Sequence, residues 1–158
     1  MRAYTLIMES ASGKPVSDKP SGDPCYCMQA RRASRKLTEL YDRELEPLGL
    51  TLPQFSLLRS CKRLGPIGIS EFASRLKLDR TTLGRNLKLL EKAGLVALDE
   101  NSEDQRERLV SLTREGTKRL EQALSAWDAA QDKVKRGLGK PSLAALNQLV
   151  KEIDKLAA

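Results

Sequence analysis

The chain has 158 residues, of which 40% are hydrophobic and 31% charged, and its net charge is +7, a balance typical of one soluble domain with a single core. No apolar run approaches the roughly 18–20 residues of a membrane span, and the first eight residues are too short for a signal-peptide core, so we expect a cytoplasmic protein without a membrane partner. The chain has no histidine and no phosphate loop, nucleophile elbow or paired-carboxylate signature, so we expect no enzyme activity, cofactor or metal site.

The first helix is predicted to follow a polar arm. Residues 1–22 are rich in Ser, Gly, Lys, Pro and Asp without helical periodicity, and we interpret them as a flexible arm. Asp23 and Pro24 suit a helix cap and a first helical position, and Pro47 and Gly49 predict the end of this helix. Its apolar and small residues form one stripe, which consists of Cys27, Ala30, Ala33, Leu37, Leu40, Tyr41 and Leu48.

The second helix is predicted to begin after Thr51, which has capping-box spacing with Gln54, and to end at Gly65-Pro66. After the short apolar stretch 67–69, Ser70 predicts the cap of a brief helix.

Asp79 predicts the cap of a longer helix, which runs to about Lys92 and ends at Ala93-Gly94. Together with the brief helix before it and the tight turn 78–80, this segment has the pattern of a helix-turn-helix.

Two short strands, 95–98 and 109–112, flank a polar loop and predict a β-hairpin. Thr113 predicts the cap of the next helix, and Gly137 and Gly139-Lys140-Pro141 are predicted to break the chain before a last helix. The apolar stripes of these two helices are Leu120, Ala123, Leu124, Trp127, Ala130 and Val134, and then Leu143, Leu146, Val150 and Ile153.

The second helix of the helix-turn-helix separates apolar from polar residues. Leu83, Leu87 and Leu90 share one side, and the opposite stripe carries Thr81, Arg85, Lys88 and Lys92. A helix of this kind reads base edges in the major groove, where an arginine such as Arg85 can bond guanine O6 and N7. The candidate DNA contacts on this helix are Arg80, Thr81, Thr82, Arg85, Asn86 and Lys88.

The tip of the hairpin places Arg106 two residues after Asp104. An aspartate at this spacing can hold the guanidinium extended, so that Arg106 enters the narrow and electronegative minor groove. The order helix, turn, helix and charged hairpin is typical of a winged helix-turn-helix.

The chain resembles the MarR family of regulators in several segments. The resemblance covers residues 78–87 and 90–96, at the second helix of the helix-turn-helix and directly after it. It also covers residues 104–106 at the hairpin tip, 109–116 after the tip, and 48–55 at the start of the second predicted helix. It implies a mainly α fold with a small β-hairpin wing, and a homodimeric transcriptional regulator of double-stranded DNA.

The resemblance also implies how the chain is divided. Residues 51–112 form the winged helix-turn-helix domain, and residues 23–50 and 113–158 supply the terminal helices of a dimerisation body. A two-fold dimer requires a pseudo-palindromic operator. Regulators of this family usually repress, and a small ligand or an oxidant releases them.

Three cysteines are candidates for the effector or redox site. Cys25 and Cys27 lie at the start of the first helix, where the helix dipole and the nearby Arg31 and Arg32 favour thiolates. The alternatives are that Cys27 and Cys61 only fill apolar positions and that Cys25 is a small exposed residue.

Three further interpretations stay open at this stage. Trp127 and Tyr41 line either a ligand pocket or the dimer core. The winged helix acts either on DNA or as a protein–protein interaction module. The near-neutral charge of segment 70–114, with nine basic and eight acidic residues, favours the second alternative. The third interpretation is an enzyme with a cysteine nucleophile, which the sequence disfavours because the chain has no histidine to act as its base.

Overall fold

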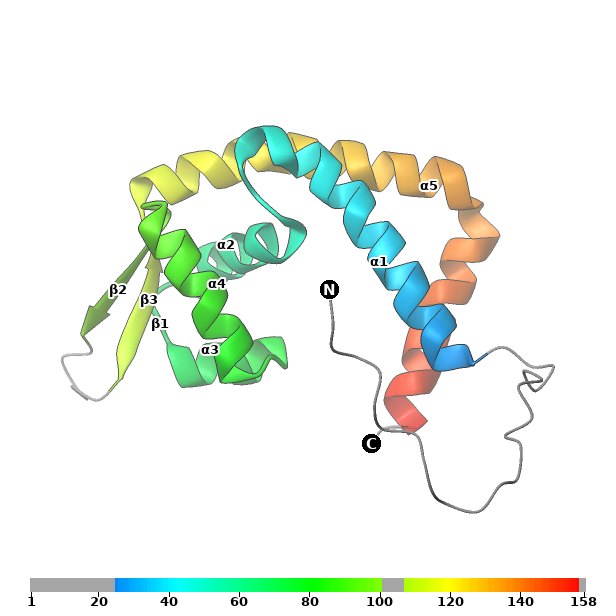
Figure 1. Cartoon of the computed structure of the whole chain (residues 1–158), viewed down its shortest axis with the longest axis horizontal. Coiled ribbons are helices and arrows are strands. Elements are labelled where there is room, and N and C mark those ends of the chain that lie inside the picture. Colours follow the sequence, from blue (N-terminus) through cyan, green and yellow to red (C-terminus); the bar gives the residue numbers. More distant parts are fainter. Residues whose placement is uncertain (1–24, 101–106, 157–158) are drawn as a thin grey trace, which may run out of the picture.

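The computed structural model describes residues 25–100 and 107–156 of the chain. The elements are α1 (Tyr26–Leu45), a 3-10 turn η1 (Glu46–Leu48), α2 (Leu52–Leu64), β1 (Ile67–Gly68), α3 (Ile69–Leu76), α4 (Arg80–Lys92), β2 (Val96–Glu100), β3 (Arg108–Leu112) and α5 (Arg114–Leu156). Figure 1 shows α2, α3, α4 and the sheet on one side, and α1 with the C-terminal half of α5 on the other. We call these two parts the head and the body.

The mainly helical fold class and the hairpin are confirmed, and the sheet has one strand more than predicted. Its three strands lie in the order β1-β3-β2 and pair antiparallel. Val110 of β3 lies opposite Leu98 on one side and Ile67 on the other. The third strand was missed because two residues are too few to show the alternation on which strand prediction depends.

Most predicted helix ends agree with the structure. The Thr51 N–H donates to Gln54 Oε1 at 3.0 Å, which is the return bond of the predicted capping box. Thr113 Oγ1 accepts from the Gly116 N–H at 2.9 Å at the start of α5. Gly94, at φ 71°, follows α4 in the left-handed backbone region that glycine favours.

Three predicted helix boundaries differ from the structure. α1 begins at Tyr26 behind Cys25, and the predicted arm 1–22 and cap at Asp23 and Pro24 lie outside the described residues. Ser70 does not cap α3, because the helix already begins at Ile69 behind Gly68, whose extended backbone makes the turn into the helix. Gly137 does not break α5. The kink lies at Gly139, whose φ of 72° and ψ of 165° are not helical, and Pro141 follows it.

The core lies in the head and under the first half of α5. Its largest fully buried side chains include Phe55, Phe72, Leu58 and Leu83. The predicted stripe of α1 is only partly covered, since Leu37, Leu40 and Tyr41 are half-buried and Cys27 is exposed. No helix among the described residues is long and apolar enough to span a membrane.

Among the described glycines, Gly116 leaves the least room for a side chain. A Cβ at Gly116 would lie 1.9 Å from the Leu95 carbonyl oxygen, whereas a Cβ at Gly137 would meet nothing within 4 Å. We expect Gly116→Ala to lower the free energy of unfolding by about 1–3 kcal/mol, because the backbone of Leu95 must move. Gly137→Ala is the control, and denaturant unfolding of both variants checks the difference. Equal midpoints would contradict the close packing of α5 on Leu95.

Candidate nucleic-acid interface

The start of α4 is fixed by the predicted cap. Asp79 Oδ1 accepts from the Thr82 N–H at 2.8 Å, and the hydrogen bonds from Thr82 hold the pKa of this carboxyl below its ordinary value. The negative charge also suits the positive end of the helix dipole. The orientation of the first turn of α4, where base contacts are expected, is therefore set locally.

The two faces of α4 are those predicted from the sequence. Leu83, Leu87 and Leu90 are at most 1% exposed and belong to the core. Arg85 and Lys88 are exposed on the other side, and within the described part of the chain no hydrogen bond or ion pair engages either of them. Both cations are therefore available to an outside partner.

Gly84 leaves this surface open. A Cβ at Gly84 would meet nothing within 4 Å, so the fold does not require glycine here. The missing side chain instead allows another surface to approach the α4 backbone closely.

The other four predicted contacts differ in how far their side chains are bonded within the protein, and Thr81 is exposed. Arg80 donates to the Ser70 hydroxyl. The Asn86 amide donates to the Thr82 carbonyl at 2.9 Å and is half-buried. Thr82 is exposed, with its backbone N–H engaged by the cap. The roles of these residues at DNA stay predictions. Of the two arginines of α4, Arg80 is bonded to Ser70, whereas Arg85 has no partner among the described residues.

The predicted wing contacts, Asp104 and Arg106, lie outside the described residues. At the base of the wing, Arg108 donates to the Leu98 carbonyl and lies 3.8 Å from Glu91 of α4. Sequence reasoning missed this link between wing and helix, because only the pairing of β2 with β3 brings Arg108 close to Glu91.

A core-anchored helix with a free cationic face, followed by a two-stranded wing, defines a winged helix-turn-helix protein of the DNA-binding class. The sequence profile of the MarR family matches residues 50–107. The transcriptional regulator YwoH of Bacillus subtilis (strain 168), described as an uncharacterized HTH-type regulator, is 35% identical over 94 residues, which are 60% of this chain and 68% of that protein.

Two further relatives agree with this profile. The organic hydroperoxide resistance transcriptional regulator of Bacillus subtilis (strain 168) is 32% identical over 63% of this chain and 67% of that protein. The crystal structure of the M. tuberculosis regulator MosR in complex with DNA has a TM-score of 0.68 and 35% identity, over 82% of this chain and 98% of that one. The chain belongs to the MarR family and is a winged helix-turn-helix transcriptional regulator.

The cysteines occupy two environments. Cys25 and Cys27 are exposed, and Cys61 is buried among core residues of α2. Burial raises the pKa of the Cys61 thiol to about 12. The buried position favours the packing interpretation of Cys61. Among the described residues, no group of three potential ligands is placed to hold a metal ion.

We expect thiol reagents to react at different rates with the exposed and the buried cysteines. At pH 8, Cys25 should react quickly with a chromogenic disulfide, and Cys61 should react only when the protein unfolds, because its thiol is buried and stays protonated. Cys61→Ala should therefore leave the fast phase unchanged. A fast phase that shrinks by one thiol in this variant would contradict the burial of Cys61.

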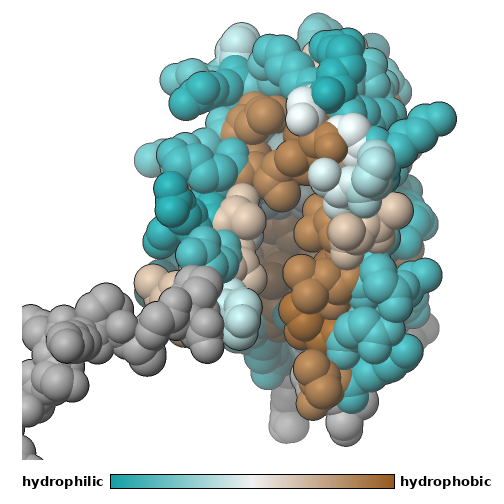
Figure 2. All heavy atoms as spheres, turned by 90° about the vertical axis from the view of Figure 1, so that its right-hand side faces the viewer, coloured by the Kyte–Doolittle hydropathy of each residue, from teal (hydrophilic) through white to brown (hydrophobic). Residues whose placement is uncertain are grey.

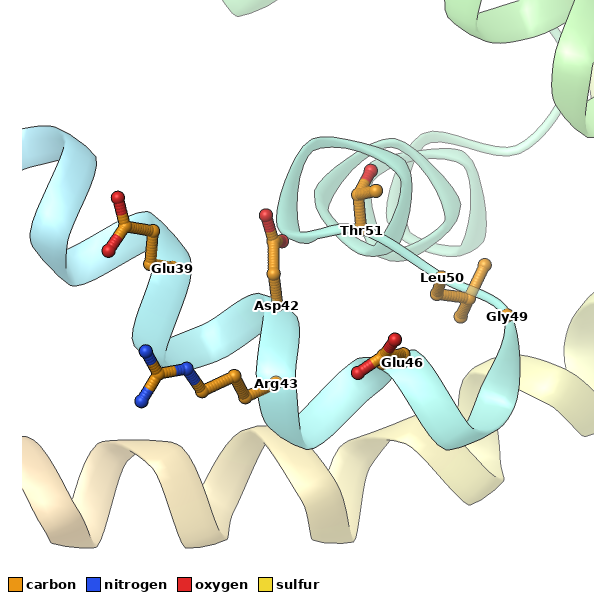
Figure 3. A pocket seen from close by; sticks show the side chains of 7 residues that line it. All are labelled: Glu39, Asp42, Arg43, Glu46, Gly49, Leu50 and Thr51. Carbon is orange, nitrogen blue, oxygen red and sulfur yellow. The ribbon is translucent and has the colours of Figure 1, made fainter.

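A cavity of about 500 Å³ lies where α1 turns toward α2 (Figure 3). Its lining residues are Glu39, Asp42, Arg43, Glu46, Gly49, Leu50 and Thr51. The predicted pocket residues Tyr41 and Trp127 do not belong to this set. Trp127 instead stacks on Phe55 with ring centroids 6.1 Å apart, and the Arg59 guanidinium lies 4.8 Å from its ring centre.

Proposed function

We propose that this regulator is a homodimeric repressor that binds a pseudo-palindromic operator and is released by a small ligand or by thiol modification. The observation that carries the proposal is the free cationic face of α4 opposite a fully buried leucine stripe. Such a face suits the major groove, where phosphates attract both cations and guanine offers two acceptors to Arg85.

The body supplies the argument for a homodimer. Six large apolar side chains of α5 beyond its middle are at least 39% exposed, namely Leu138, Leu146, Leu149, Val150, Ile153 and Leu156. Met28 of α1 is 57% exposed. We call these seven residues the apolar body face. Figure 2 shows hydrophobic side chains gathered in a hollowed strip on this side of the molecule, with hydrophilic ones along both borders.

A second copy is the occupant that this apolar body face suits best. A lone chain would leave a large apolar patch in water, and a two-fold axis through the face would cover it in both copies at once. The two heads then flank the body and present two α4 helices. On this account the body comprises residues 23–50 and 113–158, and the DNA-binding domain comprises residues 51–112.

Each predicted contact then has a role at the operator. Arg85 reads a guanine, Thr81 and Thr82 contact phosphate or a thymine methyl, and Lys88 neutralises a phosphate. In the wing, Asp104 orients Arg106 for the minor groove. Occlusion of a promoter by the bound dimer is the simplest route to repression, and it places the protein in the cytoplasm with the chromosome.

Release is proposed to act through the body. Cys25 and Cys27 are exposed at the N-terminal end of α1, next to the apolar body face. Oxidation there would add polar groups at the border of the dimer interface. The organic hydroperoxide resistance regulator among the relatives supports an oxidant as effector, and the cavity between α1 and α2 is the alternative site for a small ligand.

The test combines the mass of the protein with a selection for DNA. Light scattering should give twice the mass of the chain. Selection from a randomised duplex library should enrich a site with two inverted half-sites about one helical turn apart. A monomer, or a library without enrichment, would contradict the proposal, and the second result would favour a protein–protein interaction module instead.

A further inference from the structure

Head and body meet at an elbow, which we define as η1 together with residues 49–52. One side chain of α1 and one from the first half of α5 bond to the backbone of this elbow. Asp42 of α1 accepts from the Leu52 N–H through Oδ1 at 2.6 Å. Arg119 of α5 donates through Nη1 to the Leu48 carbonyl at 2.7 Å. Figure 3 shows the Asp42 side chain rising from α1 beside the first turn of α2.

Both bonds engage backbone groups at helix ends. Leu52 is the first residue of α2, and its N–H has no acceptor within that helix. The Leu48 carbonyl ends η1. In each bond one partner is charged, which makes the bond stronger than a neutral one. Arg119 is only 32% exposed and has Glu115 at 3.4 Å as a second partner, so its guanidinium is held toward the elbow.

The two bonds come from different helices and therefore constrain the head more than one bond would. A single bond constrains the head at one point, beside the shared apolar core that includes Leu45 and Leu120. Asp42 holds the start of α2 from α1, Arg119 holds the end of η1 from α5, and the stacking of Phe55 on Trp127 adds a third contact along α2. Together with that shared core, these contacts hold the angle between head and body.

In a two-fold dimer this angle determines how far apart the two α4 helices lie, and a change in one elbow is repeated in the other. We propose that Asp42 and Arg119 are positioning residues, which set the half-site spacing that the protein selects in DNA. The inference rests on the proposed dimeric operator binding. It assigns spacing selectivity to side chains that do not contact DNA.

The test uses the full chain and a fluorescent duplex that the wild-type protein has enriched from a randomised library. Two more duplexes carry one base pair added or removed at the dyad, and a fourth carries a single half-site. We expect Arg119→Ala and Asp42→Ala to reduce the preference for the enriched spacing by about fivefold. Their affinity for the single half-site and their dimer mass should stay at the wild-type values.

Two variants serve as controls. Lys118→Ala removes the same charge from the neighbouring exposed position of α5 and should keep the wild-type spacing profile. Asp42→Asn retains an oxygen acceptor for the Leu52 N–H, so it should keep more of the preference than Asp42→Ala. Circular dichroism establishes that every variant is folded as the wild type is.

Two results would overturn the inference. One is a wild-type spacing preference in both alanine variants. The other is an equal loss of affinity for all four duplexes, which would mean that the head itself is damaged rather than misplaced. A wild-type protein that is monomeric or enriches no duplex would instead refute the proposed function, and this result is seen before any variant is made.

Discussion

Replacing Leu149 by aspartate is expected to abolish the proposed dimer and, with it, tight operator binding. Leu149 lies on the apolar body face and is 52% exposed in the single chain, so the substitution does not disturb the core of one chain. In a two-fold dimer it would place two unpaired carboxylates in the interface. Each unpaired buried charge costs about 3–5 kcal/mol, enough to raise the dissociation constant of the dimer by more than about 100-fold.

The matched control for this prediction is Gln148→Asp. Gln148 is the neighbouring residue, lies away from the apolar stripe, and donates to Glu152 at 2.7 Å as its one side-chain partner among the described residues. The Gln148→Asp substitution adds the same charge to the same turn of α5 without removing an apolar group. Analytical ultracentrifugation should find a dimer in the control and a monomer, or an unfolded chain, in Leu149→Asp. Equal masses for both variants would place the dimer interface elsewhere.

Arg85→Ala is expected to weaken binding to the enriched operator by about 1–3 kcal/mol, or about 5- to 150-fold in Kd. Arg85 is exposed on α4 without a partner among the described residues, so its loss leaves the fold intact. The preference for guanine at one position of each half-site should relax. Affinity measured on four duplexes that differ only at that position checks this prediction.

Arg63→Ala is the control for the loss of charge. Arg63 is exposed in the last turn of α2 and has no ion pair within the described residues. Its removal should lower affinity little and equally for all four duplexes. If Arg85→Ala behaves in the same way, Arg85 contributes only charge and does not read a base.

Local signals predicted most of the head. The cap at Asp79, the capping box of α2 and the leucine stripe of α4 each depend on residues within one element, so their spacing is visible in the sequence. Boundaries set by backbone geometry were less visible. The extended backbone of Gly68 starts α3 one residue before the predicted serine cap, and the left-handed backbone of Gly139 places the kink of α5.

Contacts between elements far apart in the chain could not be predicted. Arg119 meets the Leu48 carbonyl across 71 residues, and Arg108 approaches Glu91 only through the sheet register. Such contacts depend on how rigid elements pack, and no periodicity in the sequence encodes them. Terminal helices also show leucine stripes whether their apolar face is covered by the same chain or by another, so the stripe alone does not reveal the partner.

The most direct test of the account is the fluorescence anisotropy of the wild-type protein on its enriched duplex and on a scrambled duplex of equal length, titrated at several salt concentrations. We expect the enriched duplex to bind at least about 1,000-fold more tightly at physiological salt, and the affinity for both duplexes to fall steeply as salt rises. Equal affinity for the two duplexes would contradict base reading by α4. Binding that does not depend on salt would contradict contact between its cationic face and DNA phosphates.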